Sequence, residues 1–439
     1  MQIQSRKLDR KVTVSSVIGT IIEWYDFYVY GTASALVLGA LFFSAEEPLV
    51  GTIAAFATFA VGFLARPVGA IVFGHFGDRI GRKRMLIYSL TGMGVATFLI
   101  GCLPTYDQIG VWAPVLLVAM RLIQGFCVGG EWGGAMLMAV EHAPVGRKSL
   151  AGALVQVGSP AGLVLSTLVI AIFSGLPGDA FLQWGWRVPF LLSAVLVLIG
   201  LFIRLKVEES PEFAQVKETG DEKKIPLFAT LRHAPIQVLG GVALTLAPFM
   251  FFYFLATFIL TFGVNNLGFE SSFLLWAVVL GASLELVTMP IAGHLGDRYG
   301  QGRVFVVGAV LLAIVAFPMV HLLIANPGNK FVLLAIMVLV MSLVHPLTYA
   351  LLSTMFADLF TTDVRYTGVS LAFSLGGVVG GFTPLIFTSM LTSPSYGWLI
   401  PGYMVLMSIV TTIAGVLAAR TIRKRQVLTV TEGATTVAG

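Results

Sequence analysis

Charged residues are scarce in this chain of 439 residues: Asp, Glu, Lys and Arg make up only 11% of it, against about 25% in an ordinary soluble domain. Hydrophobic residues make up 57%. A water-soluble protein of this length could not bury so much apolar surface, so lipid must be the solvent for much of the chain. The shortage of charge therefore excludes an ordinary soluble globular protein.

The sequence also lacks the motifs of several classes of catalytic and metal-binding protein. Its two cysteines, Cys102 and Cys127, lie in or beside apolar runs and have neither disulfide nor metal-ligand spacing. There is no Gly-x-x-x-x-Gly-Lys-Ser/Thr loop for a nucleotide, no His-Glu-x-x-His pair for zinc and no ion-selectivity filter. We therefore expect neither an enzyme, a primary pump nor a channel, and no catalytic residues, cofactor or metal.

What the chain does contain is twelve apolar segments, most of them longer than the roughly 20 residues that a membrane-spanning helix needs and none much shorter. The first follows a basic segment, as an export signal would. It carries Glu23 and Asp26 and has no small-residue cleavage site, so we expect it to be retained. The expected spans are 15–43, 50–77, 85–103, 112–142, 149–173, 187–203, 234–264, 271–293, 303–324, 331–357, 366–392 and 398–419.

The distribution of Lys and Arg predicts how these spans are oriented. If the spans alternate, 23 of the 27 cations lie on one face, whereas the loops of the other face hold only Arg187 and Lys330. We therefore expect both termini to be cytoplasmic. The net charge of +5 follows from this topology and does not indicate a nucleic-acid partner.

Two copies of one octapeptide divide the chain into halves. Gly74-His-Phe-Gly-Asp-Arg-Ile-Gly81 returns 219 residues later as Gly293-His-Leu-Gly-Asp-Arg-Tyr-Gly300, with six of eight positions identical. Such a repeat predicts an all-α membrane protein of two pseudo-symmetric six-helix bundles, an architecture typical of transporters. The expected division is an N-terminal bundle at 1–203, a cytoplasmic loop at 204–233, a C-terminal bundle at 234–420 and a cytoplasmic tail at 421–439.

Five motifs carry a family resemblance: Glu23-Trp-Tyr-Asp-Phe27, Gly74-His-Phe-Gly-Asp-Arg-Ile-Gly-Arg-Lys83, Arg121-Leu-Ile-Gln-Gly125, Gly129-Gly-Glu-Trp-Gly-Gly134 and Trp184-Gly-Trp-Arg-Val-Pro189. They are similar to motifs of the metabolite:proton symporter family within the major facilitator superfamily. That family includes shikimate, 2-oxoglutarate, citrate and proline/betaine carriers, and the N-terminal half is most similar to the shikimate carriers. The resemblance covers nearly the whole chain and implies the major facilitator fold.

The repeated loop suits a gate on the cytoplasmic side. Its glycines allow backbones to approach closely at a helix end, and the resemblance implies that Asp78 meets the N-terminal end of span 11. We expect Arg82 to pair with Glu141. The second copy reads Gly300-Gln-Gly-Arg303 and lacks the Arg-Lys pair, so that gate should be weaker. The expected gating residues are Gly74, Asp78, Arg79, Gly81, Arg82, Glu141, Arg147, Asp297, Arg298, Asp358 and Arg365.

Four charges inside the predicted spans occur in the N-terminal half only. Adding the repeat offset to Glu23, Asp26, Arg121 and Glu131 gives uncharged residues. A charge at mid-membrane costs roughly 2.5–3.5 kcal/mol, so we expect these four, with Arg66, to face a cavity or one another. Three acids against two arginines leave one carboxylate over, and such a group in a partly dry cavity can take up a proton.

We expect Asp26 to be the proton site, with Arg121 as its ion-pair partner and a candidate anchor for a substrate carboxylate. Glu131 and Glu23 are the alternatives, in that order, and for each acid a static structural ion pair is the simpler interpretation. In the C-terminal half Glu285 stands at the repeat position of Arg66. The candidate substrate contacts are Arg121, Arg66, Gln124, Tyr30, Trp24, Trp132, Gln156, Tyr253 and His345.

The sequence thus predicts a multi-pass cell-membrane protein that imports a small organic acid with protons by alternating access. Two alternatives stay open: a proton symporter of a zwitterion such as betaine or proline, whose cation would lie over aromatic rings, and an antiporter or uniporter of the same fold. Val155-Gln-Val-Gly-Ser-Pro-Ala-Gly162 keeps only a Gly-Ser-Pro fragment of the antiporter signature, which favours symport. The expected partners are the substrate, an organic anion, together with protons and the bilayer; short loops and the lack of any Asn-x-Ser/Thr site suit a bacterial inner membrane.

Overall fold

The computed structural model describes residues 10–44, 47–80, 82–129, 132–141, 143–144, 146–205, 234–361 and 365–437, and within these ranges it is helical, without a β-strand. Nine of the described helices are long and apolar enough to cross a membrane, and two shorter apolar helices, Ile87–Cys102 and Trp112–Val128, accompany them. Together with the helix that begins at Arg10 they match the twelve expected spans one for one.

The six spans of the N-terminal half contain one to three helices each. In chain order they are α1 (Arg10–Ala33) with η1 (Ser34–Leu38) and α2 (Gly39–Phe42); α3 (Pro48–Ile80); α4 (Arg82–Cys102), followed by the short α5 (Tyr106–Ile109); α6 (Trp112–Val128) with α7 (Trp132–Glu141); α8 (Lys148–Gln156) with α9 (Gly158–Ser174); and η2 (Phe181–Gly185) with α10 (Arg187–Leu191) and α11 (Ser193–Leu205). Span 6 thus begins at Phe181, before the expected start at 187.

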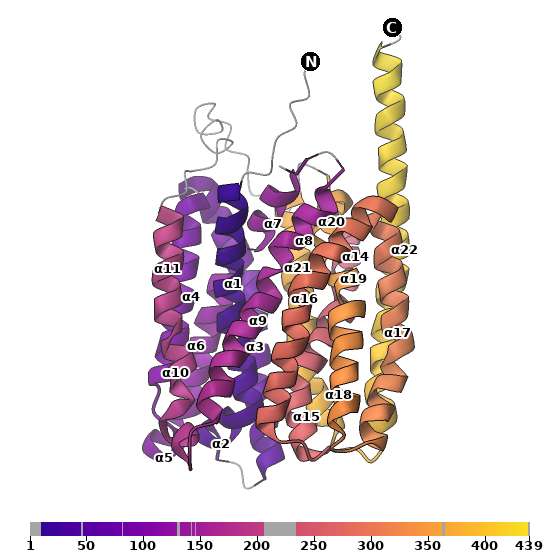
Figure 1. Ribbon diagram of the computed structural model, residues 1–439. Coiled ribbons are helices and arrows are strands. Elements are labelled where there is room, and N and C mark those ends of the chain that lie inside the picture. The colour runs from indigo at the N-terminus through magenta and orange to yellow at the C-terminus, as the bar shows by residue number, and fades with distance from the viewer. Residues whose placement is uncertain are drawn as a thin grey trace.

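The C-terminal half repeats this pattern of six spans. They are α14 (Pro235–Tyr253) with η3 (Phe254–Phe258) and α15 (Ile259–Asn265); α16 (Ser271–Tyr299); α17 (Gln301–Ala325); α18 (Lys330–Ile336) with η4 (Met337–Val344), α19 (Pro346–Tyr349) and α20 (Leu352–Leu359); α21 (Arg365–Met390); and α22 (Tyr396–Val437). Helix α22 continues well past the expected end at 419 and projects from the bundle (Figure 1).

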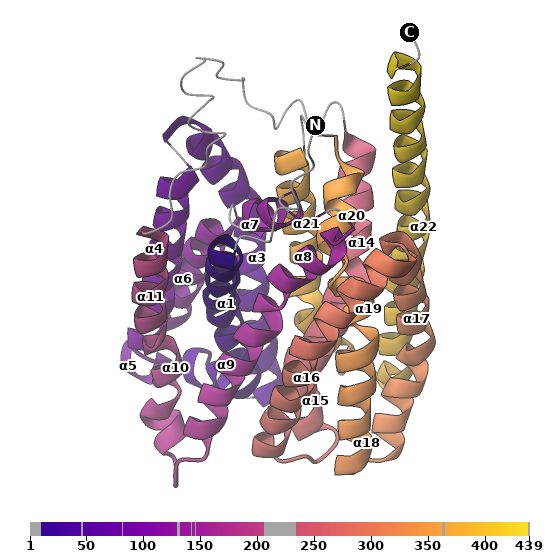
Figure 2. The same cartoon turned by 45° about the horizontal axis from the view of Figure 1, so that its top comes forward.

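The two halves lie side by side, coloured indigo to magenta and red to yellow (Figure 1), and the tilted view keeps them apart (Figure 2). The start of α1 and the end of α22 lie on the same face, in agreement with the charge distribution. The expected division at 204–233 stays a prediction, since residues 206–233 lie outside the described part. Large apolar side chains such as Ile236 and Phe331 are exposed, as lipid-facing positions should be.

The halves meet along two equivalent pairs of spans. Span 2, α3, packs against span 11, α21, and span 5, α8 and α9, packs against span 8, α16. Glycine is needed where these helices approach most closely: a Cβ on Gly381 would lie 2.2 Å from the ring of Phe63, and one on Gly293 would lie 2.6 Å from the Cβ of Ala153. The reciprocal pairing is what the half-chain repeat predicts.

Two π-helical segments occupy corresponding places in spans 1 and 7. Segment η1 begins at Ser34 and η3 at Phe254, one residue from the repeat offset. A π-turn inserts a residue into the α-helical ladder and is frequently found at functional sites. The hydroxyl of Thr261 donates a 3.3 Å hydrogen bond to the carbonyl of Ala35 in η1. This bond ties the halves together at the end of the bundle opposite the termini.

Candidate functional site

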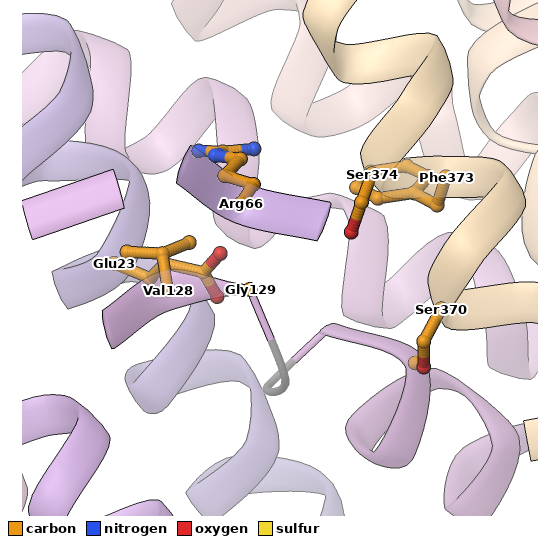
Figure 3. Close-up of a pocket in the computed structure, with 8 residues that line it drawn as sticks. Glu23, Arg66, Val128, Gly129, Ser370, Phe373 and Ser374 are labelled. Carbon is orange, nitrogen blue, oxygen red and sulfur yellow. The ribbon is translucent and has the colours of Figure 1, made fainter. Parts of the chain in front are cut away.

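A small cavity lies between helices of the two halves (Figure 3). Its volume is about 10 Å³, whereas a single water needs roughly 10–15 Å³ on the same measure. An organic acid cannot fit unless the walls move apart. The cavity is lined by Glu23 of α1, Arg66 of α3, Val128 of α6, Gly129, Gly133 of α7, and Ser370, Phe373 and Ser374 of α21.

Arg66 is the cation of this cavity. Its side chain is buried, and its guanidinium carbon lies 3.8 Å from the ring centroid of Phe27 and 4.5 Å from that of Phe63. Two of its nitrogens, Nε and Nη2, have no hydrogen-bond partner among the described residues. Glu23 lines the same cavity and acts on Arg66 electrostatically. A buried guanidinium with unused donors is an incomplete anion site.

Arg121, on α6, is held by uncharged groups. Its Nη1 donates to the side-chain oxygen of Gln124, and its Nη2 donates over 3.0 Å to the carbonyl of Phe59 on α3. The guanidinium carbon lies 4.0 Å from the ring centroid of Tyr30. Within the described part of the chain Arg121 makes no ion pair with a carboxylate, although it is completely buried.

Asp26 is completely buried, and neither of its carboxylate oxygens has a hydrogen-bond partner among the described residues. Thr97 of α4 lies beside the carboxylate, but its hydroxyl donates to the Met93 carbonyl at 3.0 Å. The amide nitrogen of Gln124 donates to the Asp26 backbone carbonyl and to Thr97. The ion pair expected between Asp26 and Arg121 is thus not formed in this conformation, because Gln124 takes the Arg121 donor.

Two other predicted aromatic contacts belong to the N-terminal wall. The hydroxyl of Tyr30 is hydrogen-bonded to Thr58. Trp24 stacks on Tyr28 at a centroid distance of 5.1 Å, and its Nε1 has no partner in the described structure. Trp24 also lies 5.4 Å from the guanidinium carbon of Arg66. These rings therefore form an apolar frame around the arginine.

An aromatic seam closes the contact between the halves at this level. Tyr253 of α14 meets Phe59 and Phe63 of α3, each at a centroid distance of 5.7 Å. Tyr28 of α1 meets Phe252 at 5.2 Å. Tyr253 was a predicted substrate contact, and the structure places it against the N-terminal half.

His345 and Glu285 form a buried pair that the sequence pattern did not predict. Nδ1 of His345 is hydrogen-bonded to Oε1 of Glu285, and both side chains are almost fully inaccessible to solvent. Glu285 Oε2 and His345 Nε2 have no partner among the described residues. In the sequence Glu285 stands out as an acid at the repeat position of Arg66, but its spacing from His345 does not indicate that the two side chains meet.

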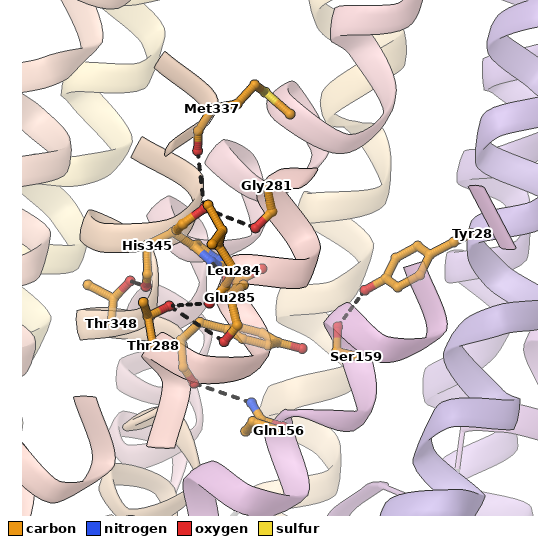
Figure 4. A network of polar contacts seen from close by, with 12 residues as sticks. Tyr28, Gln156, Ser159, Gly281, Leu284, Glu285, Thr288, Met337, His345 and Thr348 are labelled. Atoms are coloured by element: carbon orange, nitrogen blue, oxygen red, sulfur yellow. Dashed lines mark hydrogen bonds and ion pairs between the residues drawn. The ribbon is translucent and has the colours of Figure 1, made fainter. Parts of the chain in front are cut away.

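A polar network extends from this pair to the N-terminal half (Figure 4). The ring of Tyr349 stacks on His345 at 5.1 Å. The backbone carbonyl of Tyr349 accepts a 3.3 Å hydrogen bond from the side-chain amide of Gln156 on α8. The hydroxyls of Tyr28 and Ser159 are hydrogen-bonded at 2.6 Å. Gln156, a predicted substrate contact, is thus a bridge between the halves.

On the cytoplasmic side Asp297 caps a helix of the opposite half. Its two carboxylate oxygens accept from the backbone nitrogens of Ser149 and Leu150 at 2.7 and 3.0 Å. These are orphan donors at the start of α8, where a carboxylate is favoured by the helix dipole. Nearby, Gln301 donates over 2.7 Å to Asp358. Gln301 stands at the repeat position of Arg82, so a neutral amide replaces a cation in this copy.

A second cytoplasmic contact joins the halves through charge. Arg365 Nη1 lies 2.9 Å from Glu141 Oε1, and both side chains are partly exposed. We expected Arg82 as the partner of Glu141, but the side chain of Arg82 lies outside the described residues. Exposed ion pairs contribute about 0–1 kcal/mol, so the cap made by Asp297 should be the stronger contact of the two.

The structure describes only some of the remaining predicted residues. Arg147 and Arg298 are exposed on the cytoplasmic side, and Arg298 lies over the ring of Tyr299. The residues that lie outside the described part, either wholly or in their side chains, are Gly74, Asp78, Arg79, Gly81, Arg82, Glu131 and Trp132.

The chain is similar to several known transporters. Residues 16–384 match the model of the Major Facilitator Superfamily. The shikimate transporter of Escherichia coli is 42% identical over 393 residues, which cover 89% of each chain. The proline/betaine transporter of the same organism is 34% identical over 428 residues, covering 94% of this chain and 84% of that one.

A solved structure of a D-xylose-proton symporter has the same fold, with a TM-score of 0.70 over 95% of this chain and 97% of the other at 17% identity. The described helices and the family match agree with the expected fold and membrane location. The chain is therefore a multi-pass membrane transporter that belongs to the Major Facilitator Superfamily.

Proposed function

We propose that this carrier is a proton symporter that imports a small organic anion, with Asp26 as its proton site and Arg66 as the anchor for a substrate carboxylate. The observation that carries the proposal is the buried Asp26 carboxylate without a hydrogen-bond partner among the described residues. An ionised carboxylate in such a place would cost several kcal/mol. A neutral, protonated carboxylic acid fits the geometry.

The two arginines of the N-terminal half take different parts in this proposal. Arg66 lines the cavity and has two unused nitrogens, whereas Arg121 already donates to Gln124 and to the Phe59 carbonyl. A substrate carboxylate would complete the hydrogen bonding of Arg66 with two charge-assisted bonds. Arg121 shares Gln124 as a hydrogen-bonding neighbour with Asp26, so in this proposal it is Arg121 that balances the charge of an ionised Asp26.

The coupling step follows from the position of Gln124. With Asp26 neutral, Gln124 and Phe59 hold Arg121, as in this structure. When Asp26 loses its proton, the buried carboxylate needs a cation, and Arg121 leaves Gln124 to pair with it. That movement breaks the bond to α3, the helix that packs against α21 of the other half. The charge of Asp26 would therefore bias how the halves close.

Reconstituted carrier in proteoliposomes gives the test. Accumulation driven by an inside-alkaline pH gradient is measured for a panel of cyclic acids, keto-acids, tricarboxylates and betaines. The Asp26→Asn variant should lose most of this accumulation and keep counterflow exchange of the substrate found. If Asp26→Asn accumulates that substrate as strongly as the wild type does, the assignment of the proton site is wrong.

A zwitterionic substrate is the second candidate. The relative named as a proline/betaine transporter and the rings of Trp24, Tyr28 and Phe252 near the cavity support it, since aromatic faces attract quaternary ammonium groups. The panel separates the two: uptake of a betaine, with no uptake of the anions, would replace the organic-anion proposal and leave the proton site untouched.

A further inference from the structure

The Glu285–His345 pair is the one buried titratable cluster of the described residues that the proposed mechanism does not use. Glu285 lies on α16, and His345 follows η4 directly. The backbone N–H of His345 donates a 2.9 Å hydrogen bond to the carbonyl of Val340, five residues earlier in the chain. This π-type bond re-aims the side chain toward α16, and such turns are frequent at functional sites.

The charges of the pair do not balance without an additional proton. When His345 is neutral and donates Nδ1–H to Glu285, the pair carries one negative charge. No Lys or Arg of the described residues forms an ion pair with Glu285 to offset it. One more proton, bound at His345 Nε2 or Glu285 Oε2, makes the pair neutral. Both atoms have no partner in the described structure, so both are free to receive it.

The surroundings of the pair contain phenols and uncharged groups. Tyr349 stacks on His345, and Phe252 of α14 packs on the other side at 5.6 Å. Tyr28 of α1 and Tyr253 of α14 are the other titratable neighbours at this level, and Ser159 of α9 is a hydroxyl. None of these groups carries a charge near neutral pH. Beyond them, Arg66 of α3 and Glu23 of α1 act electrostatically on Tyr349, but their charges are opposite in sign. The proton balance of the site is therefore assigned to Glu285 and His345, whose direct electrostatic partner is each other.

The position of the pair connects it to the movement of the halves. Tyr349 links His345 to Gln156 of the N-terminal half, and Tyr28 and Ser159 lie in the same network (Figure 4). When the halves separate along α16 and α8–α9, the hydrogen bonds of this network break and water can reach the pair. A group that meets water only when the halves open can take a proton on one side and release it on the other.

We propose that Glu285 and His345 form a second proton site, in the C-terminal half, which is loaded and emptied once in each transport cycle in addition to Asp26. The inference rests on the proposed function, because it deepens proton symport into a cycle that moves one proton more with each substrate molecule.

The test measures how strongly a pH gradient concentrates the substrate. Proteoliposomes are clamped at zero membrane potential, and the accumulation ratio at zero net flux is read for an inside-alkaline gradient of one pH unit. Each coupled proton contributes about a factor of ten to that ratio. Wild-type carrier should reach about a hundredfold ratio. A wild-type ratio of about tenfold would overturn the second site and leave the proposed function standing. No accumulation at all would overturn the proposed function itself.

Two conservative variants separate a proton site from a structural pair. Glu285→Gln and the double variant Glu285→Gln with His345→Asn each keep hydrogen-bonding groups at the contact. Without the carboxylate the pair is already neutral when His345 is neutral, and the double variant has no group left that can hold the additional proton. Both should lower the ratio to about tenfold and keep counterflow exchange. A hundredfold ratio in both variants, with only a lower melting temperature, would show that the pair is structural. Loss of all accumulation would place the coupling on this pair alone and also overturn the proposal.

His321 supplies the matched control. It lies on α17 with Nδ1 hydrogen-bonded to the Phe317 carbonyl and its ring against Trp398, and it contributes no hydrogen bond to the network of Glu285 and His345. The His321→Asn variant should keep the wild-type ratio. If His321→Asn lowers the ratio as much as the double variant of Glu285 and His345 does, the effect is not specific to the pair and the proposal fails.

Discussion

The side-chain amide of Gln124 donates a 3.1 Å hydrogen bond to the backbone carbonyl of Asp26, while its oxygen accepts from Arg121. One uncharged residue thus lies between the acid and the base that the sequence predicts as partners. Arg121 thus has hydrogen-bond acceptors without forming an ion pair. The carboxylate of Asp26 is therefore free to bind and release a proton.

Replacing Gln124 by leucine should therefore destabilise the carrier. The change leaves a donor of Arg121 and the side chain of Thr97 with fewer partners, and each buried unsatisfied polar group costs about 1–3 kcal/mol. Thermal unfolding in detergent checks this. The exposed Gln183 of η2 is the control, since Gln183→Leu should change stability by no more than about 0.5 kcal/mol. Equal melting temperatures for the two variants would contradict the role given to Gln124.

Arg66→Lys should raise the KM for an anionic substrate with little effect on folding. Lysine keeps the charge but loses the planar fork, and a charge-assisted hydrogen bond contributes about 1.5–3 kcal/mol. The expected rise is about tenfold or more. Initial uptake rates against substrate concentration give the measurement.

The control for Arg66 is Arg187, which donates to the carbonyls of Gly101 and Leu103 at 2.9 and 2.6 Å on the opposite side of the membrane from the termini. Arg187→Lys should affect thermal stability and leave the KM unchanged. An unaltered KM in Arg66→Lys would remove this arginine from the substrate site.

Removing the carboxylate of Asp297 should favour opening on the cytoplasmic side. A helix cap contributes about 0.5–2 kcal/mol, so Asp297→Ala should shift the population between closed and open by roughly 2- to 30-fold. The labelling rate of a cysteine placed at Ala153, which packs against Gly293, reports the opening once Cys102 and Cys127 are replaced. Glu141→Gln removes an exposed pair and should have a smaller effect. The reverse order would show that charge, not capping, holds this side closed.

Gly381→Ala should stop the halves from closing. The added Cβ would lie 2.2 Å from the ring of Phe63, and overpacking of this kind costs about 1–3 kcal/mol. Transport should fall by about tenfold or more, while detergent-solubilised protein remains folded. Gly402→Ala, where nothing lies within 4 Å of the new Cβ, is the control and should transport normally. Normal transport by Gly381→Ala would mean that α3 and α21 need not approach so closely.

The twelve spans and the two halves were predictable because they depend on one-dimensional signals. Long apolar runs, the bias of Lys and Arg and the repeated octapeptide are read directly from the chain, and they fix which helices exist. Burial of Asp26, Arg66 and Arg121 followed as well, since charges inside apolar spans are expected to point inward.

Contacts between spans were harder to predict, because they depend on helix rotation by a few tens of degrees. Nothing in the spacing of Asp26 and Arg121 shows that Gln124 lies between them. The pairing of Glu285 with His345 depends on a π-type bond from His345 to Val340, which shifts the register in a way that regular helical periodicity does not contain. Likewise Arg365 pairs with Glu141 across the two halves, a contact between residues that belong to different copies of the repeat.

The additional residue in η1 and in η3 has a consequence for mapping experiments. One inserted residue rotates everything beyond it by about 100° relative to a continuous α-helix. A stripe traced upstream of Ser34 or Phe254 therefore does not continue on the same side downstream. Cysteine scans of these two helices should show the accessible phase jump at that point, at matching places in both copies.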